Sequence, residues 1–162
     1  MTEPIQKIKL HPMIQKMEDS VINLLPLDDK SHINEYIYDL ELPDDADGVS
    51  VIKGYAAESI GRMALKYDSN FIIICGSIPH LKNNLHSKHN HVIASVARAC
   101  TCIAHTGGAI ELKNNGFDEL LKNIIKTDSI PFYVRTECAR AYGWIISMVE
   151  IEKEQEVKKL LH

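Results

Sequence analysis

The most restrictive feature of this sequence is a pattern of small and apolar residues that recurs at offsets of 40 and 42 residues. Three ten-residue segments carry it: 55–64, 95–104 and 137–146. Each has small side chains at its third and fifth positions and a larger apolar side chain at its ninth. Glycine recurs with the same period at Gly76 and Gly116. Repeats of this length with helical spacing predict an all-α solenoid, in which neighbouring helices stack on one another.

Packing explains this pattern. Small side chains on an inward helix let its neighbour approach closely, and the larger apolar side chain fills the space one turn away. Glycine permits the sharp turn from one short helix into the next. Residues 71–75 are rich in β-branched side chains and could also form a buried strand. Because no second strand is available to pair with them, and because they precede Gly76, we expect a short helix capped by Asp68 or Ser69.

The chain outside the repeats also has helical spacing. Residues 11–25 and 33–40 place apolar side chains three or four positions apart, which predicts two helices. We therefore expect residues 1–50 to form an acidic helical cap and linker, residues 51–148 to form the repeats, and residues 149–162 to form a C-terminal capping helix.

Charge is unevenly distributed along the chain. The net charge of −4 combines 11 acidic and 4 basic residues in 1–50, 7 and 11 in 51–148, and 4 and 3 in 149–162. The small basic excess over the repeats is weak for nucleic-acid binding, which requires a strongly basic surface. The longest apolar run is far shorter than the ~20 residues of a bilayer span, and neither a signal-peptide pattern nor a CxxC pair is visible. We expect a cytoplasmic protein with reduced cysteines and without a nucleic-acid or membrane partner.

Two stretches of the repeat region resemble armadillo repeats. Residues 76–104 begin with GSIPHL and continue into an alanine-rich helix, and residues 115–147 follow the same plan, starting from NGF. Residues 134–145 also resemble the related HEAT signature. The resemblance covers about residues 51–148. It implies an armadillo-like right-handed superhelix of about three short helical repeats, with capping helices at both ends. In such a fold, the third helix of each repeat lines a concave face that receives an extended peptide.

The residues at the peptide-binding positions differ from those of the nuclear-import members of this family. Those members present a tryptophan and, four residues later, an asparagine. The tryptophan positions correspond here to Glu58, Arg98 and Arg140, and the asparagine positions to Arg62, Cys102 and Trp144. The resemblance therefore argues against a lysine-rich ligand. It implies a row of arginines on successive helices, which would bind carboxylates or phosphates through paired hydrogen bonds, with the tryptophan as an apolar anchor.

Simpler roles are open for these side chains. Arginines on a helix surface are usually solvated or paired with an acid, and Glu58 lies four residues before Arg62, at the spacing of an ion pair within one helix. Trp144 is equally well explained as a core residue packed against the C-terminal helix. The acidic segment 41–47 is either a solvated linker or a strap that folds over the arginine row and competes with a partner.

We recognise no catalytic or metal-binding motif. His86, His89 and His91 fall on a turn with no cysteine at zinc-finger spacing, so we expect neither a metal nor a cofactor. The thiols of Cys100 and Cys102 point to different sides of a helix, which excludes a disulfide between them. The segment 106–108 lacks the lysine of a phosphate-binding loop.

We therefore expect a non-catalytic protein-interaction module, an adaptor or assembly subunit that binds an acidic or phosphorylated segment on its concave face. One alternative is a homodimer or complex subunit that associates through an apolar solenoid end, and another is a chaperone for a client protein. An enzyme on a helical-repeat scaffold is less well supported. It would require a pocket of titratable groups with strongly perturbed pKa values, near His105 or the histidine turn.

Overall fold

The computed structural model describes residues 30–161, which form helices and loops without a strand. The order is η1 (Lys30–His32), α2 (Ile33–Leu40), α3 (Val49–Tyr67), α4 (Ser69–Ile74), α5 (Ser77–Asn84), α6 (Asn90–Ile103), η2 (Ala104–Gly108), α7 (Ala109–Asn114), α8 (Phe117–Ile125) and α9 (Phe132–Leu161). The prediction of an all-α protein is confirmed for these residues.

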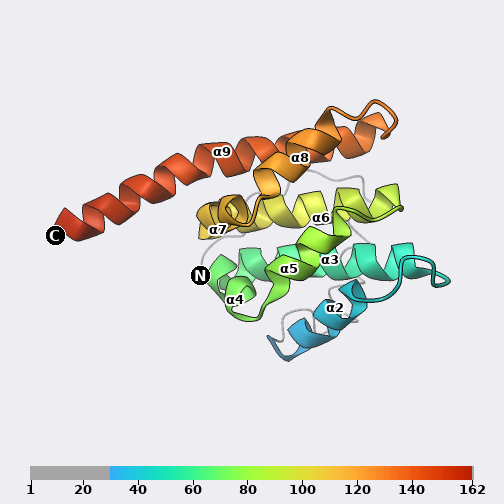
Figure 1. The fold of residues 1–162 in the computed structure, drawn as a ribbon. Helices are drawn as coiled ribbons and strands as arrows, with labels where there is room; N and C mark the ends of the chain where they lie inside the picture. The colour runs from blue at the N-terminus through green and yellow to red at the C-terminus, as the bar shows by residue number, and fades with distance from the viewer. Residues whose placement is uncertain (1–29, 162) are drawn as a thin grey trace, which may run out of the picture.

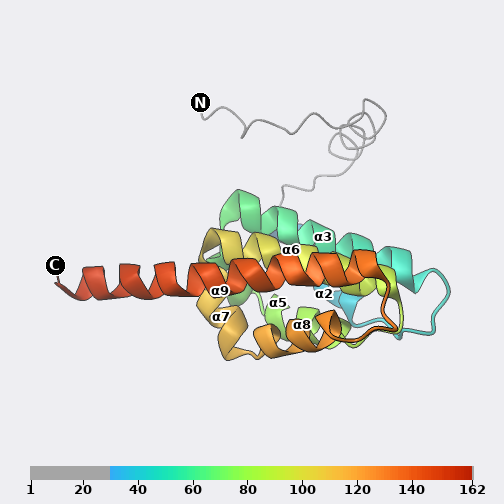
Figure 2. The same cartoon turned by 90° about the horizontal axis from the view of Figure 1, so that it is seen from above.

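The helices form two layers (Figures 1 and 2). α3, α6 and α9 lie side by side in one layer, and α6 packs against both of its neighbours. α2, α5 and α8 lie on one side of this layer, where they pack against α3, α6 and α9 respectively. The short helices α4 and α7 precede α5 and α8. The order short helix, short helix, long helix therefore occurs twice, in α4–α5–α6 and in α7–α8–α9.

Small residues bring the long helices together, as the repeat pattern predicts. A Cβ atom added to Gly61 on α3 would lie 3.0 Å from the Cα atom of Ala99 on α6, so the two backbones are almost in contact. Larger apolar side chains fill the space around these contacts. Among those that are fully buried are Ile60, Met63, Ile72, Leu81, Ile103, Leu112, Phe117, Leu121 and Ile145.

The turns that precede α4, α5 and α8 depend on two glycines and one aspartate. Gly76 and Gly116 precede α5 and α8, and both have φ = 81°, a left-handed conformation that favours glycine. The Asp68 side chain accepts a hydrogen bond from Phe71 N at 3.1 Å and so caps α4. The β-branched segment 71–75 is therefore helical at its core, as predicted, with Asp68 as the cap.

The three helices predicted outside the repeats have different outcomes. The helix expected at residues 33–40 is α2, with the same bounds. The one expected at 11–25 lies outside the described residues. We expected a separate capping helix at 149–162, but residues 149–161 continue α9 without a break. The physical reason is that residues 144–161 contain no glycine or proline and are rich in good helix formers.

Candidate interaction surface

Four charged side chains from three helices meet on the exposed side of the α3–α6–α9 layer. Arg98 on α6 donates from Nη1 to Glu58 Oε1 on α3 at 2.7 Å. Its Nε atom lies 3.6 Å from Glu137 Oε1 on α9. The other oxygen of Glu137 accepts from Arg140 Nη1 at 3.3 Å. Glu58, Arg98, Glu137 and Arg140 therefore form one chain of alternating charges across all three helices, which we call the charged row.

The charged row differs from the row of arginines that the sequence predicted. It contains Arg98 and Arg140 but not Arg62. Each of these two arginines lies next to a carboxylate, so the two positive and two negative charges of the row balance. Arg98 lies between two carboxylates with its side chain 42% exposed, whereas Arg140 contacts one and is 57% exposed. Arg140 consequently has more capacity for a further anionic partner.

The third predicted arginine, Arg62, has a different environment. It donates from Nη2 to Ser59 Oγ at 3.0 Å, and its guanidinium carbon lies 5.7 Å from the centroid of the Tyr55 ring. The ion pair between Glu58 and Arg62, one of the alternatives that the sequence left open, is not among the contacts of either residue, because Glu58 reaches across to Arg98 instead. Cys102 is half-buried near this arginine, and burial raises the pKa of its thiol although the positive charge of Arg62 opposes the shift.

Trp144 lies at the surface, not in the core. Its side chain is 36% exposed and makes an edge-to-face contact with His105, with 4.8 Å between the ring centroids. Trp144 is one helical turn beyond Arg140 on α9, so a cation and a large aromatic ring lie next to each other at one end of the charged row. Tryptophan and arginine are both enriched at the energetically important positions of protein interfaces.

Glu137 is the member of the charged row that the sequence analysis missed. Its carboxylate is the least exposed of the charged row, at 16%, and it contacts both Arg98 and Arg140. A local signal was available, because Glu137 precedes Arg140 by three residues and an ion pair is common at that spacing. Its contact with Arg98 joins residues 39 positions apart and requires the packing of α9 on α6.

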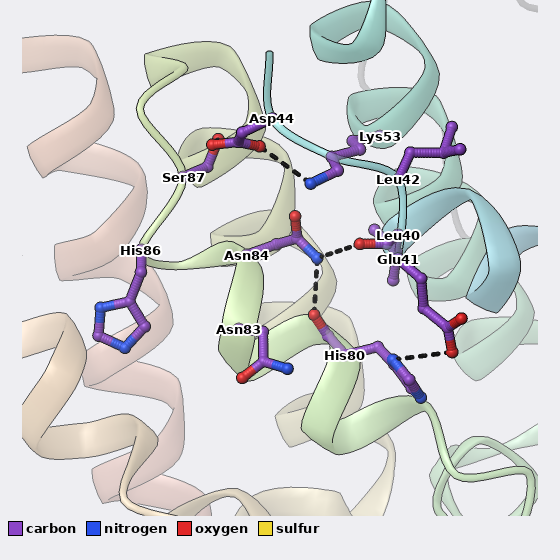
Figure 3. Close-up of a pocket in the computed structure, with 10 residues that line it drawn as sticks. All are labelled: Leu40, Glu41, Leu42, Asp44, Lys53, His80, Asn83, Asn84, His86 and Ser87. Carbon is purple, nitrogen blue, oxygen red and sulfur yellow. Dashed lines mark hydrogen bonds and ion pairs between the residues drawn. The ribbon is translucent and has the colours of Figure 1, made fainter. Parts of the chain in front are cut away.

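The acidic segment 41–47 is attached to a different part of the molecule. Asp44 Oδ1 accepts from Lys53 Nζ at 2.9 Å, and Oδ2 accepts from Ser87 Oγ and Lys88 N, both at 2.8 Å. Asp44, Lys53 and Ser87 line a cavity of about 340 Å³ between the segment and α5. Figure 3 shows these three side chains at its edge. The described contacts of this segment therefore lead to α3, α5 and the α5–α6 turn, and none of them reaches the charged row.

Asp44 has the most clearly perturbed carboxyl group of the described residues. Burial alone would raise its pKa. The hydrogen bonds from Lys53, Lys88 and Ser87, together with the positive charge of Lys53, outweigh this effect and lower the pKa of Asp44 to about 2. Asp44 is thus ionised at neutral pH, and its carboxylate attaches the loop to Lys53, Ser87 and Lys88. The cavity also contains His80, which pairs with Glu41 at 3.5 Å, and His86, which points outward in Figure 3.

The histidine turn and the cysteines, which the sequence analysis also considered, have contacts that belong to the fold. Of the histidine turn, His89 Nε2 lies 2.7 Å from the Asp44 carbonyl oxygen. Among residues 30–161, no three His, Cys, Asp or Glu side chains gather into a group that could hold a metal ion. The four cysteines are free thiols, and Cys100 and Cys138 are fully buried. Burial raises the pKa of Cys100 well above its ordinary value and, with the nearby charge of Glu137, raises the pKa of Cys138 to about 12.

Comparison with known proteins gives no relative. No family model, no curated protein and no solved structure matches this chain. In the described range, every helix is too short or too polar to span a lipid bilayer.

Proposed function

We propose that this chain is a non-catalytic protein-interaction module, built as an armadillo-like right-handed solenoid, that binds an acidic or phosphorylated segment of another protein on the exposed face of α3, α6 and α9. Three features support the repeat architecture. The long helices stack in chain order, the order of helices repeats, and the glycines that start α5 and α8 have the same backbone conformation 40 residues apart. A stacked layer of this kind offers a continuous surface made of side chains from successive helices.

The observation that carries the proposal is the position of Arg140 beside Trp144. Glu137 engages only Nη1 of the Arg140 guanidinium, so Nη2 and Nε are further donors for a carboxylate or phosphate. Trp144 supplies a rigid apolar contact one turn away. Together they provide charge recognition and apolar contact area within a single helical turn.

The rest of the surface positions this pair. Arg98, itself paired with Glu58, orients Glu137. Arg62 offers a second cation on α3, close to Cys102 on α6. A ligand anion at Nη2 and Nε of Arg140 meets a guanidinium whose charge Glu137 already partly neutralises. The negative charge of Glu137 therefore lowers the affinity, and a phosphate gains from its greater charge.

Peptide pools fixed on an array test the proposal. The pools carry phosphoserine, phosphothreonine or glutamate at one fixed position, and matched pools carry serine or threonine without phosphate. We expect retention of the protein on the phosphorylated or glutamate pools. The best pool is then synthesised as one peptide and titrated, with intrinsic fluorescence as the readout, because Trp144 is the only tryptophan of the chain.

Three variants make this titration specific. Arg140→Gln should weaken binding about tenfold, since one charge-assisted hydrogen bond contributes roughly 1.4 kcal/mol. Glu137→Gln should strengthen it, because a carboxylate that repels the ligand anion is removed. Lys126→Gln, at the end of α8 in the other layer, is the control and should leave the affinity unchanged. Equal retention on all pools, or equal affinities for wild type, Arg140→Gln and Glu137→Gln, would refute the proposal.

A further inference from the structure

A stripe of exposed residues runs along the whole of α9, on the side away from α6. Its members are alternately four and three positions apart, and every one is exposed: Phe132, Thr136, Ala139, Gly143, Ile146, Glu150, Lys153, Val157 and Leu160. We call this set the α9 stripe. A spacing that averages 3.5 residues is that of the contact line between two helices in a coiled coil.

The first half of the α9 stripe includes the repeat position at which α3 receives α6. Gly61 on α3 faces α6, and a Cβ atom added there would lie 3.0 Å from Ala99 Cα. Gly143 occupies the same position of the repeat on α9, and no described atom lies within 4 Å of a Cβ atom placed there. The repeat thus ends on a helix that keeps the small residues of a helix-packing face but has no described helix packed against it.

The second half of the α9 stripe projects beyond the other helices, as Figures 1 and 2 show. α9 has 30 residues, which corresponds to a length of about 45 Å. Near the point where α9 leaves the body, Glu152 accepts hydrogen bonds from Ala109 N and Ile110 N at 2.9 and 3.2 Å. Beyond this point, Val157, Leu160 and Leu161 are 55%, 87% and 76% exposed.

We propose that the α9 stripe binds the α9 stripe of a second copy of this chain, with the two helices antiparallel. The projecting half of each α9 then covers the uncovered half of the other. Pairing centred between Gly143 and Ile146 places Ile146 of each copy opposite Gly143 of its partner, where the missing side chain leaves room. The same pairing places Phe132 opposite Val157.

Charge complementarity supports the antiparallel direction. The pairing that joins Gly143 to Ile146 also places Arg140 beside Glu150 of the other copy, and the two-fold symmetry makes this ion pair twice. The contact continues the small-residue packing that already joins α3 to α6. The pairing uses Arg140, which also belongs to the proposed ligand site. Ile146→Glu leaves the charged row unchanged, so this variant distinguishes a failure of the dimer from a failure of the proposed function.

Sedimentation equilibrium on the full chain measures the mass directly. We expect twice the 18.3 kDa of one chain at high concentration and dissociation on dilution. Ile146→Glu should give a monomer, because it buries two carboxylates at the centre of the contact. The matched control is Ile74→Glu on α4, a residue that is 75% exposed and away from α9; it should remain a dimer. Circular dichroism confirms that each variant is folded.

A charge exchange tests the direction of the helices. Arg140→Glu and Glu150→Arg should each weaken the dimer at least several-fold, and the double variant should restore it, because the pair is re-formed with its signs reversed. A monomeric wild-type chain, or a dimer that survives Ile146→Glu, would overturn the proposal. A double variant no more dimeric than the two single ones would overturn the antiparallel arrangement.

Discussion

Asp44 shows how one side chain can hold a loop against two helices. Its folded-state pKa of about 2 is below the ordinary value of 3.8, so its ionised form is favoured by folding. The stabilisation is complete above the unfolded-state pKa and is lost as the pH falls through the folded-state value. We therefore expect Asp44→Asn to lower the free energy of unfolding by about 2 kcal/mol at neutral pH, the equivalent of its pKa shift.

Urea denaturation at a series of pH values checks this prediction. The difference between wild type and Asp44→Asn should shrink as the pH falls from about 4 to about 2, where the wild-type carboxyl is protonated. Asp47→Asn is the control, because Asp47 is an exposed acid in the same loop; its effect should be small at every pH. A difference that stays constant over this range would mean that Asp44 acts through shape and not through charge.

Gly61 and Gly143 form a matched pair of positions in the repeat. Alanine at Gly61 would push against the α6 backbone, so we expect a loss of about 1–3 kcal/mol of stability. Alanine at Gly143 meets no described atom and improves helix propensity, so we expect a gain of up to about 1 kcal/mol. Chemical denaturation measures both, in an Ile146→Glu background that keeps dimerisation out of the comparison. Equal effects at the two sites would contradict the packing difference.

At the scale of helices, local sequence signals were sufficient for most of the fold. α2 was predictable from the spacing of Ile33, Tyr36, Ile37 and Leu40, all of which are buried. α4 was predictable despite its β-branched residues, because a capping aspartate precedes it and a glycine follows it. The end of α9 was not, since the amphipathic pattern of residues 149–161 looks the same for a packed cap as for a helix that extends beyond the body.

Glu152 connects two helices that the sequence does not link. Its carboxylate accepts hydrogen bonds from the first two backbone N–H groups of α7, which have no partner inside their own helix. We expect Glu152→Gln to cost about 1–2 kcal/mol, because charge-assisted hydrogen bonds at a helix N-terminus are lost. Thermal unfolding checks this against Glu154→Gln, whose ion pair with Lys158 is exposed and lies within α9. Equal melting temperatures for the two variants would contradict the role of Glu152 as a cap.

At the scale of the whole molecule, the helix order was predictable and the surface electrostatics were not. The 40-residue pattern indicates which helices stack, because small residues at fixed positions require close neighbours. The charged row was misjudged because its decisive partner, Glu137, contacts Arg98 only after α9 has packed on α6. The repeat positions identify the arginines, but they do not identify the acidic residues on neighbouring helices that pair with these arginines in the folded protein.

Because Cys100 and Cys138 are buried, the reactivity of their thiols measures how often the packed helices separate. Both thiols are 0% exposed, and their raised pKa values leave almost no thiolate to react. Cys75 and Cys102 are partly exposed. A thiol reagent should therefore modify Cys75 first and Cys102 more slowly, because burial raises the pKa of Cys102. It should modify Cys100 and Cys138 only when α6 and α9 separate. The rate of the slow phase of thiol modification, followed by mass spectrometry, measures how often the layer of α3, α6 and α9 opens in the native state. This rate should increase when urea is added.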